Sequence, residues 1–475
     1  MTANAAEEIN AGRYTSRQKS TIAVAVVTSL ITTVMGSSLN LAIPSIGGEF
    51  HVSAGMIGWV ITGYMLVTAT CSVPFGRLAD LTDRKKVLVV GIAIFAFTSL
   101  AAVFCDSMML LLAARMLQGV GAAMIFATNH AILISAFPGN MRGRVLGYAL
   151  SATYIGLSAG PVIGGIFTHN FGWRSLFVFS FIISTFVLII AAKGLDPQRS
   201  PQGTSLNAET ADVPGNILYI VSLTMLLFGL TEINRGMWPA LLSLAGFILL
   251  VLFFRHEMHT ASPVVDVRLF KSNIAYTLSN IATLLNYGAT FAITYMLSIY
   301  FQVVKGMDSQ TAGFILITTP LVMAVLTPAA GRLSDRKSPY IMASAGMGIC
   351  ALPLFFYCFI SKDTSVWIII IALLVAGIGF ATFSSPNTNA VLGCVDREYY
   401  GVASSLLATM RTMGHTLSMV AITVIVTMNM GSLSLAEAEP DTLIHTMHQA
   451  FTLFSLTCVA GVFISLKRNT NIKRE

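Results

Sequence analysis

Long apolar stretches separated by short polar segments make up most of the chain from Thr21 onwards. A helix needs about 20 apolar residues to cross the hydrocarbon core of a bilayer, and fourteen stretches reach that length. The pattern therefore predicts an all-α membrane protein with fourteen transmembrane helices. They begin near Thr21, Ala54, Val87, Met108, Val145, Leu176, Gly215, Ala240, Ile274, Ala312, Ile341, Val366, Val402 and Phe451. Because the number is even, both termini are expected on one side of the membrane.

The polar segments divide these spans into groups of six, two and six. The one long connector is rich in Pro, Gly, Ser and acidic residues, which is typical of a linker, and it follows the sixth span. We predict an N-terminal tail, a six-helix bundle, a linker, two inserted helices, a connector, a second six-helix bundle and a C-terminal tail. Their boundaries are 1–20, 21–193, 194–213, 214–256, 257–273, 274–466 and 467–475.

Composition supports a membrane protein and excludes several other classes. Of the 475 residues, 55% are hydrophobic and 10% charged, and the mean hydropathy is +0.76, whereas soluble domains are about 25% charged. The six cysteines are scattered through apolar runs without C-x-x-C spacing, so a disulfide scaffold is excluded. The first twenty residues are polar and precede a full-length span, so we expect no removable signal peptide.

The positions of Lys and Arg predict the topology. With the N-terminus inside, 22 of the 28 basic residues fall in the tails and inner loops and four in the outer loops, while Arg115 and Arg411 lie within spans. Positive charge is retained on the cytoplasmic side of membranes. We therefore expect a multi-pass protein of the cell inner membrane with both termini cytoplasmic. The net charge of +7 is spread between apolar stretches, so we expect no nucleic-acid partner.

A short motif occurs twice, each time in the loop after the second helix of a six-helix group. The loop after span two contains GRLADLTDRKK, and the loop after span ten contains GRLSDRK. The glycine allows two helix ends to approach, and the charged groups can hydrogen-bond across the loop. The loops therefore act as latches between moving helices, or else the basic residues set only the topology and Asp80 caps the next helix. The latch candidates are Gly76, Asp80, Arg84, Lys85, Asp335 and Arg336.

Polar side chains within the fourth span predict a hydrated interior. An arginine deep in a membrane costs at least ~2.5 to 3.5 kcal/mol on insertion scales, so Arg115 needs a partner or a wet cavity. Gln118 and Asn129 share roughly its helical face. The alternative is that Arg115 extends to the outer surface and has no role in a cavity.

The thirteenth span places Arg411 and His415 four residues apart, on one helical face. A neighbouring cation disfavours the charged imidazole, which makes His415 a candidate proton carrier. The alternative is a hydrogen-bonded structural histidine. His130 and Arg115 are the other candidates for proton coupling.

Further polar residues within spans could line a substrate cavity, or could simply hydrogen-bond neighbouring helices. These are Ser37, Asn40, Tyr154, Asn286, Tyr287, Thr290 and Asn387. In the fifth span, Gly160 and Pro161 predict a bend that serves as a pivot, or else a tightly packed helix seam.

Missing motifs argue against an enzyme. The chain contains no Gly-Lys dipeptide and hence no P-loop, and it contains no H-E-x-x-H motif. All 21 acidic residues fall in loops or at the ends of spans, which disfavours enzymes that need buried carboxylates. We expect no cofactor and no metal.

The same residues resemble the major facilitator superfamily, specifically its fourteen-span drug/proton antiporter branch, over essentially the whole chain. GRLADLTDRKK is similar to the family's loop signature, LLAARMLQGVGAA to its fourth-helix motif, GYALSATYIGLSAGPVIGG to the antiporter motif of helix five, and FGWRSLF to the element that follows it. GIGFATFSSPNTNAVLG and GVASSLLATMRTMGHTLSMVAI resemble the late helices of that branch. The resemblance implies two six-helix bundles, two inserted helices and alternating access.

One departure from the branch bears on function. Helix one usually carries a membrane aspartate, and Met35 occupies its position in VMGSSLNLAIP. The remaining charged or titratable groups within spans are basic, which suits neutral amphipaths or organic anions better than cations. We expect a monomeric secondary transporter that couples protons to multidrug-type efflux of small amphipathic solutes. The alternatives are a carrier, in the export or the import direction, of amphipathic anions such as bile-acid-like carboxylates, and a membrane sensor that transports nothing.

Overall fold

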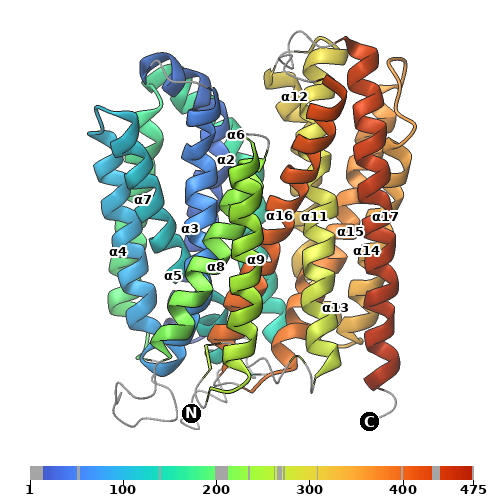
Figure 1. Cartoon of the computed structure of the whole chain (residues 1–475). Helices are drawn as coiled ribbons and strands as arrows, with labels where there is room; N and C mark the ends of the chain where they lie inside the picture. The colour runs from blue at the N-terminus through green and yellow to red at the C-terminus, as the bar shows by residue number, and fades with distance from the viewer. Residues whose placement is uncertain are drawn as a thin grey trace. The chain divides into compact units, whose positions relative to one another are not determined.

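The fold is entirely helical in the part of the chain that the structure describes (Figure 1). The structure is a computed structural model. It describes residues 14–50, 54–138, 141–197, 212–233, 236–260, 263–264, 270, 273–307, 309–396, 399–430 and 439–472. The chain forms two compact units, each of which has its own packing. Unit 1 comprises Met1–Thr210 and Val395–Ser405, and unit 2 comprises Ala211–Cys394 and Leu406–Glu475.

Unit 1 is built mainly from six long helices. They are α2 (Ser16–Phe50), α3 (Ala54–Leu81), α4 (Arg84–Val103), α5 (Met108–Ser135), α6 (Arg142–Phe171) and α7 (Arg174–Gly194). Helix α2 packs mainly on α6, α5 packs on both α3 and α4, and α7 packs on α4 and α2. The core between them is apolar, and Met35 and Leu39 of α2 are fully buried in it.

Local sequence explains where the helices of unit 1 begin and end. Asp83 caps α4, because its Oδ1 accepts a hydrogen bond of 2.9 Å from the Lys85 N–H. Ser107 caps α5 in the same way. Gly172 ends α6 with φ +76°, a left-handed conformation that glycine adopts without strain.

Unit 2 holds the remaining helices. They are α8 (Val213–Thr231), α9 (Met237–Glu257), α11 (Ile274–Ile299), the π-helix η4 (Tyr300–Val304), α12 (Ser309–Leu316), α13 (Thr318–Ser334), α14 (Pro339–Tyr357), α15 (Val366–Gly393), most of α16 (Tyr400–Met430) and α17 (Pro440–Ile472). Helices α8 and α9 pack mainly on each other. The interior of α11–α17 is formed by α14 and α15, which pack on each other and on their neighbours α13 and α17.

The packing of unit 2 repeats that of unit 1. In unit 1 the helix pairs α3–α5, α4–α5, α4–α7 and α2–α7 are in contact, and in unit 2 the corresponding pairs are α13–α15, α14–α15, α14–α17 and α11–α17. The same order of packing supports the internal duplication that the two GRLxD loops predict.

Glycine contacts repeat in atomic detail. A Cβ on Gly121 of α5 would lie 2.8 Å from the Gly91 carbonyl oxygen, and a Cβ on Gly379 of α15 would lie 2.9 Å from the Gly346 carbonyl oxygen. Both distances are too short for a side chain, so the two helix pairs approach backbone to backbone. The duplication therefore extends to the closest helix contacts.

Fewer helices meet a simple membrane-span criterion than the fourteen predicted. In the described part of the chain, eleven helices are long and apolar enough to cross a membrane, or twelve if the bent helix α6 counts as one span. Helices α11 and α16 are not among them, although they have 26 and 31 residues. Helix α11 does not meet the criterion because its stripe of buried Ser, Asn and Thr side chains lowers its hydropathy.

The helix surfaces are typical of a protein in lipid. Large apolar side chains are widely exposed, including Phe97 at 70%, Trp367 at 75% and Met237 at 77%. Exposed apolar area on this scale is rare in soluble monomers. These faces fit the hydrocarbon core of a bilayer.

Candidate functional site

Arg115 is the centre of a buried polar network in unit 1. Its side chain is fully buried. Its Nε donates to the Val60 carbonyl oxygen at 3.0 Å, its Nη1 donates to Gln118 Oε1, and its guanidinium carbon lies 4.3 Å from the centre of the Tyr64 ring. The predicted alternative, an arginine that extends to the membrane surface, is therefore wrong. Gln118, which the sequence places on roughly the same helical face, is one of its hydrogen-bond partners.

The network continues from Gln118 through two serines. Gln118 Nε2 donates to Ser99 Oγ at 2.6 Å, and Ser99 Oγ lies 3.0 Å from Ser180 Oγ. It thus links α5 with α3, α4 and α7. The Nη2 atom of Arg115 has no hydrogen-bond partner among the described residues. A buried charged donor without a partner is costly, so this atom is suited to a water molecule or an anionic ligand.

Other predicted residues of unit 1 hold helices together and lie apart from this network. Asn129 Nδ2 donates to the Ala25 carbonyl oxygen at 3.1 Å and to Ser29 Oγ at 2.9 Å, which ties α5 to α2. Ser37 Oγ donates to the Gly156 carbonyl oxygen at 3.3 Å and so ties α2 to α6.

A Cβ on Gly160 would collide with Ser37 Oγ, so glycine at 160 is needed for the close contact of α6 with α2. His130 and Tyr154 are buried, at 8% and 2% exposure. The side chains of Asn40 and Pro161 lie outside the described residues.

Met35 occupies the position where the antiporter branch carries its membrane aspartate. The side chain is fully buried in the apolar core of unit 1, with Ile31 and Leu39 on the same helix. The described residues of this core cluster are apolar. A thioether carries no proton, so Met35 cannot take the role of the aspartate.

Unit 2 brings three predicted residues together. Tyr287 of α11 lies beside Arg411 and His415 of α16: the Arg411 guanidinium carbon is 5.3 Å from the Tyr287 ring centre, and the His415 ring centre is 5.6 Å from it. His415 also stacks on Phe291 at 4.5 Å. The Tyr287 hydroxyl lies 3.2 Å from Ser384 Oγ. This cluster combines aromatic surface with cationic charge.

Arg411 is held by few protein contacts. Its Nη2 donates to Thr388 Oγ1 at 2.9 Å, and its Nε has no hydrogen-bond partner among the described residues. Arg411 and His415 are partly exposed within unit 2. A partly exposed guanidinium beside aromatic rings can bind the carboxylate and the apolar body of an amphipathic anion.

Arg468 is a residue that the sequence analysis missed. It was assigned to the C-terminal tail, but α17 continues to Ile472 and the Arg468 side chain is fully buried. Its Nη1 donates to Asn387 Oδ1 at 2.6 Å and to Ser279 Oγ at 3.0 Å. Arg468 follows the buried Ser465 by three residues, so the two side chains lie on the same helical face. This spacing is the signal in the sequence that accompanies Arg468.

The other predicted residues of unit 2 lie along α11 and α15. Asn387 Nδ2 donates to Thr283 Oγ1 at 2.8 Å and to the Ser279 carbonyl oxygen at 3.3 Å. Thr290 Oγ1 donates to the Asn286 carbonyl oxygen at 2.7 Å, and the Asn286 side chain is fully buried. The Asn387 hydrogen bonds tie α15 to α11, whereas the Thr290 hydrogen bond lies within α11.

The first GRLxD loop forms the charge cluster that the motif predicts. Asp80 Oδ1 accepts from Arg84 Nη2 at 2.8 Å and from Arg84 Nε at 3.0 Å, and Arg84 Nη1 donates to Ser135 Oγ at 3.3 Å. Lys85 Nζ donates to the Leu195 carbonyl oxygen at 2.6 Å. The end of α3, the start of α4 and the ends of α5 and α7 are thereby joined. The cap of α4 is Asp83, so the alternative in which Asp80 is the cap is wrong.

The second loop is arranged differently. Asp335 Oδ1 accepts from Asn389 Nδ2 at 3.5 Å, and the side chain of Arg336 is exposed. Gly76 and Gly331, the glycines that begin the two motifs, are both buried. The two copies share their backbone position but differ in their ion pairs.

The FGWRSLF element joins the end of α2 to the start of α7. Trp173 Nε1 donates to Glu49 Oε2 at 2.7 Å, and Arg174 Nη1 donates to Glu49 Oε1 at 2.7 Å. The hydrogen bond from Trp173 and then those from Arg174 outweigh burial and hold the pKa of Glu49 below its ordinary value. Arg174 also donates to the Cys105 carbonyl oxygen at 3.0 Å.

Comparison with known proteins identifies the family. The family model described as "Major Facilitator Superfamily" matches residues 25–419. The chain belongs to this superfamily. It is therefore a multi-pass membrane protein and a secondary transporter of small solutes rather than an enzyme, and the predicted alternative of a sensor that transports nothing is disfavoured.

Individual members of the superfamily are distant relatives. The riboflavin transporter RibZ of Clostridioides difficile is 30% identical over 388 residues, which cover 82% of this chain and 83% of that protein. The multidrug resistance protein Stp of Mycobacterium tuberculosis is 26% identical over 385 residues, which cover 80% of this chain and 70% of that protein. The crystal structure of the human organic anion transporter MFSD10 has the same fold, with a TM-score of 0.68 at 12% identity, and covers 94% of this chain and 99% of that one.

Proposed function

We propose that this chain exports small amphipathic organic solutes in exchange for protons. The observation that carries the proposal is the sign of the buried charge. Arg115, Arg411 and His415 lie well inside helices, whereas every acidic residue in the described part of the chain lies at a helix end or between helices. In a low-dielectric site, such charges favour neutral amphipaths and organic anions over cations.

The relatives support an organic solute as the substrate. One is named a riboflavin transporter and another a multidrug resistance protein. The contact of Tyr287 and Phe291 with His415 adds aromatic surface on which such a solute can pack. Within unit 1, the unpartnered nitrogen of Arg115 is a separate hydrogen-bond donor.

His415 is our first candidate for the proton carrier, because Met35 replaces the aspartate of the antiporter branch. The imidazole lies on the same helix as Arg411, one turn away, and packs on two aromatic rings. Substrate near Arg411 would change the charge beside it, which couples the two events electrostatically. His130 and Arg115 are the further candidates.

We propose the full fourteen-span arrangement for the membrane topology, in which α11 and α16 also cross the bilayer of the inner membrane. Their lengths of 26 and 31 residues are sufficient. The polar faces of these helices would then face the protein interior. Both termini are cytoplasmic in this arrangement, and the chain works as a monomer with the predicted bundles at 21–193 and 274–466.

Alternating access requires helix ends that separate and rejoin. The pair of Asp80 and Arg84 would latch one end of unit 1, Asp335 and Arg336 would act at the matching loop of unit 2, and Gly160 with Pro161 would let α6 bend. Two guanidinium nitrogens of Arg84 donate to one carboxylate oxygen of Asp80. Such a buried ion pair is suited to a latch, because breaking it releases both hydrogen bonds together.

A second candidate function is a carrier for amphipathic organic anions, in either direction. The basic character of Arg115, Arg411 and Arg468 favours it, since the described part of the chain offers no acidic side chain well inside a helix to pair with a cationic substrate. The two candidates differ in the charge of the preferred substrate and in the direction of its movement relative to protons.

The test uses purified full-length protein in proteoliposomes with an imposed pH gradient. Labelled amphipathic cations, anions and neutral molecules are compared, with proton movement followed by an internal pH dye. We expect neutral or anionic probes to move against protons in the wild type. Arg411→Gln and His415→Ala should abolish coupling, whereas Arg255→Gln and His259→Ala, which change exposed residues without a role in the proposed transport, should leave it intact.

The outcomes separate the hypotheses. Movement of an anion together with protons supports the anion carrier, and movement of probes against protons supports the exporter. Efficient transport of lipophilic cations without transport of anions contradicts both hypotheses. Unchanged proton movement in His415→Ala removes that residue from the coupling mechanism.

A further inference from the structure

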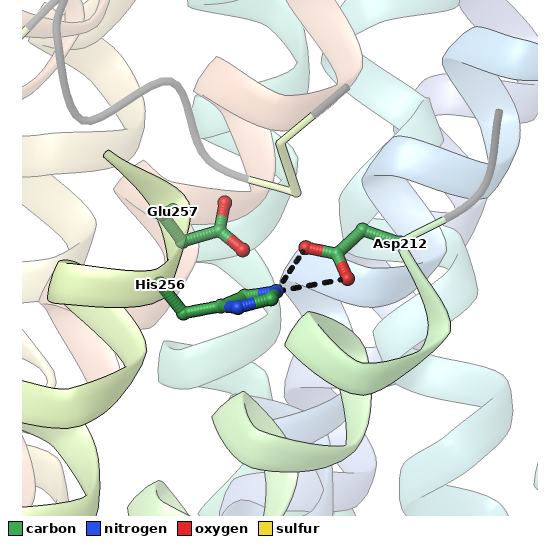
Figure 2. A group of neighbouring side chains, drawn as sticks. All are labelled: Asp212, His256 and Glu257. Carbon is green, nitrogen blue, oxygen red and sulfur yellow. Dashed lines mark hydrogen bonds and ion pairs between the residues drawn. The ribbon is translucent and has the colours of Figure 1, made fainter. Parts of the chain in front are cut away.

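Two carboxyl groups and an imidazole converge at one end of the helix pair α8 and α9. Asp212 is the N-cap residue of α8, and His256 and Glu257 are the last two residues of α9. One ligand atom from each side chain lies within 4.8 Å of the other two. Figure 2 shows the three side chains directed toward one another from the two helices.

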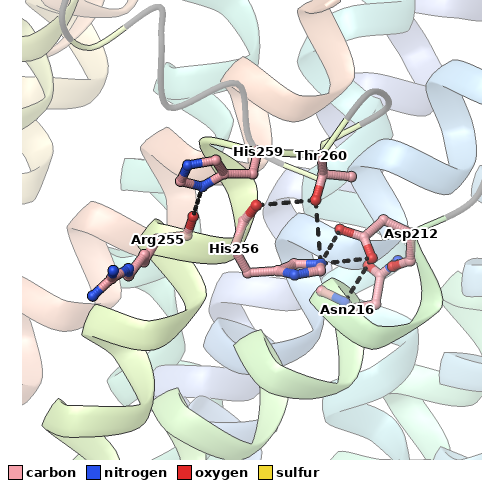
Figure 3. Close-up of polar contacts among 7 residues, drawn as sticks. Asp212, Asn216, Arg255, His256, His259 and Thr260 are labelled. Carbon is pink, nitrogen blue, oxygen red and sulfur yellow. Dashed lines mark hydrogen bonds and ion pairs between the residues drawn. The ribbon is translucent and has the colours of Figure 1, made fainter.

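The spacing of these atoms suits a metal ion. His256 Nε2 lies 3.1 Å from Asp212 Oδ1 and 3.0 Å from Asp212 Oδ2, and Thr260 Oγ1 lies 3.3 Å from the same nitrogen (Figure 3). A tetrahedral Zn²⁺ with bonds of about 2.0 Å places its ligand atoms roughly 3.3 Å apart. Small side-chain rotations would therefore convert the hydrogen bonds into a coordination shell.

Burial makes a positive partner for the carboxyl groups favourable. The Asp212 side chain is 4% exposed and Glu257 is fully buried. Two carboxylates this close repel each other in a low dielectric unless a cation or a shared proton compensates. A divalent cation neutralises both carboxylates and leaves the imidazole as a neutral ligand.

The first turn of α8 is shaped to admit both carboxyl groups. A Cβ on Gly215 would lie 2.6 Å from Glu257 Oε1 and would collide with the Asp212 carboxyl group. The Gly215 N–H donates to Asp212 Oδ1 at 2.8 Å.

We propose that Asp212, His256 and Glu257 form a binding site for a divalent transition-metal ion of the Zn²⁺ type, which fastens the start of α8 to the end of α9. The ligand set of one nitrogen and two carboxylates matches zinc and its neighbours in the periodic table. Mg²⁺ and Ca²⁺ prefer shells made of oxygen ligands alone, whereas this set includes an imidazole nitrogen. Neither the family resemblance nor the proposed transport function requires this site.

The test measures metal binding directly on the full-length protein in detergent, purified without a histidine tag. Zn²⁺ affinity and stoichiometry come from competition with a chromophoric chelator, and Co²⁺ serves as a probe whose visible absorption reports tetrahedral coordination. We expect one Zn²⁺ per chain and intense Co²⁺ bands. His256→Gln and Glu257→Gln should each weaken Zn²⁺ binding at least about tenfold.

The matched control is His259→Gln. His259 lies one turn beyond His256, is exposed, and directs its Nδ1 to the Arg255 carbonyl oxygen at 2.8 Å, away from the cluster (Figure 3). It should bind Zn²⁺ with wild-type affinity. Full affinity in the His256 and Glu257 variants, or no saturable binding by the wild type, overturns the proposal.

A second measurement guards against variants that fold poorly. Zn²⁺ should raise the melting temperature of the wild type and of His259→Gln in proportion to its saturation of the site. It should leave His256→Gln unchanged. A shift of equal size in all three proteins, or no shift in any, also overturns the proposal. Transport assays are not needed, so failure of the proposed function does not affect this result.

Discussion

Replacing Gly346 by alanine should destabilise unit 2, whereas the same change at Gly348, two residues further along α14, should not. A Cβ on Gly346 would lie 2.7 Å from the Thr382 carbonyl carbon and 2.8 Å from the Gly379 carbonyl oxygen. A Cβ on Gly348 would have no neighbour within 4 Å. The same substitution on α14 therefore meets backbone atoms of α15 at position 346 and open space at position 348.

The size of the effect follows from these distances. Ordinary contacts of a Cβ begin at 3.4 Å, so α14 and α15 must separate by roughly half an ångström or more, because backbone atoms cannot rotate away. Overpacking of this kind costs about 1–3 kcal/mol, against a gain of about 0.8–1 kcal/mol from the higher helix propensity of alanine. The net cost at Gly346 is therefore about 0–2 kcal/mol, and the short backbone contacts place it in the upper part of this range. Gly348→Ala should be neutral or stabilising, because its Cβ meets open space.

Thermal unfolding of the purified variants in one detergent measures the difference. Gly346→Ala should melt below the wild type and Gly348→Ala at or above it. Gly91→Ala tests the corresponding contact of unit 1, where the new Cβ would lie 2.6 Å from Met124 Cβ and 3.0 Å from the Gly121 carbonyl oxygen. Equal shifts in Gly346→Ala and Gly348→Ala would refute the backbone-contact explanation.

Three further predictions concern charged groups. Arg468→Met should lower the melting temperature by several degrees, because the Asn387 amide oxygen loses the donor that lies 2.6 Å away; an unchanged melting curve contradicts this role. Asp80→Asn should weaken the pair with Arg84 and lower transport more than stability, as comparison of initial transport rates with melting curves will show. Because the pKa of Glu49 is lowered, its stabilising contribution is present above the unfolded-state pKa and is lost as the pH falls through the folded-state pKa. Melting temperatures of Glu49→Gln should therefore converge with those of the wild type in acid, and a constant difference at every pH argues against the assignment.

Apolar length and basic-residue counts predict the class of protein, and the motifs predict the family, but the helix contacts could not be predicted. Gly121 and Gly379 stand in the sequence as single glycines within apolar runs. Their importance depends on which helix lies opposite, and one sequence does not contain that information. The GRLxD loops showed the duplication because loop residues keep their local pattern, whereas helix contacts repeat only in space.

Buried cations were predictable where a local pattern accompanied them. Arg115 was found with its partner because Gln118 follows at i+3, and Arg411 was found with His415 at i+4. Arg468 was missed because its partners, Ser279 and Asn387, come from distant helices, and because it follows an apolar run beside Lys467 as a tail residue would. A basic residue at the end of a span can be an exposed tail residue or a buried residue, and only the packing distinguishes the two.

Helix contacts occur at matching positions in the two units, whereas the charged groups within helices do not. The tie from Asn129 to α2 is repeated by the tie from Asn387 to α11. A Cβ on Gly119 would lie 2.8 Å from the carbonyl oxygen of Tyr64, as one on Gly377 would from that of Thr319.

These contacts fix which positions correspond. Four residues before Gly119 stands Arg115, and four before Gly377 stands Leu373. Gly414 and Gly156 correspond in the same way: an added Cβ would lie 2.7 Å from the Leu284 carbonyl oxygen at Gly414 and 2.7 Å from the Leu30 carbonyl oxygen at Gly156. His415 follows the first glycine, and Leu157 follows the second.

The two units thus share the contacts that hold each bundle together, but they differ at the positions of these charged groups. A structural role would be served equally well in both copies, so the unshared positions are where transport chemistry is to be sought. Under the proposed function, these positions are Arg115 in unit 1, which would donate to an anionic solute, and His415 in unit 2, which is the candidate proton carrier. Introducing Leu373→Arg or Leu157→His should therefore add no transport activity, because the surrounding partners are absent. Gain of coupled transport by either variant would show that the charge alone is sufficient and that the surrounding contacts are not required.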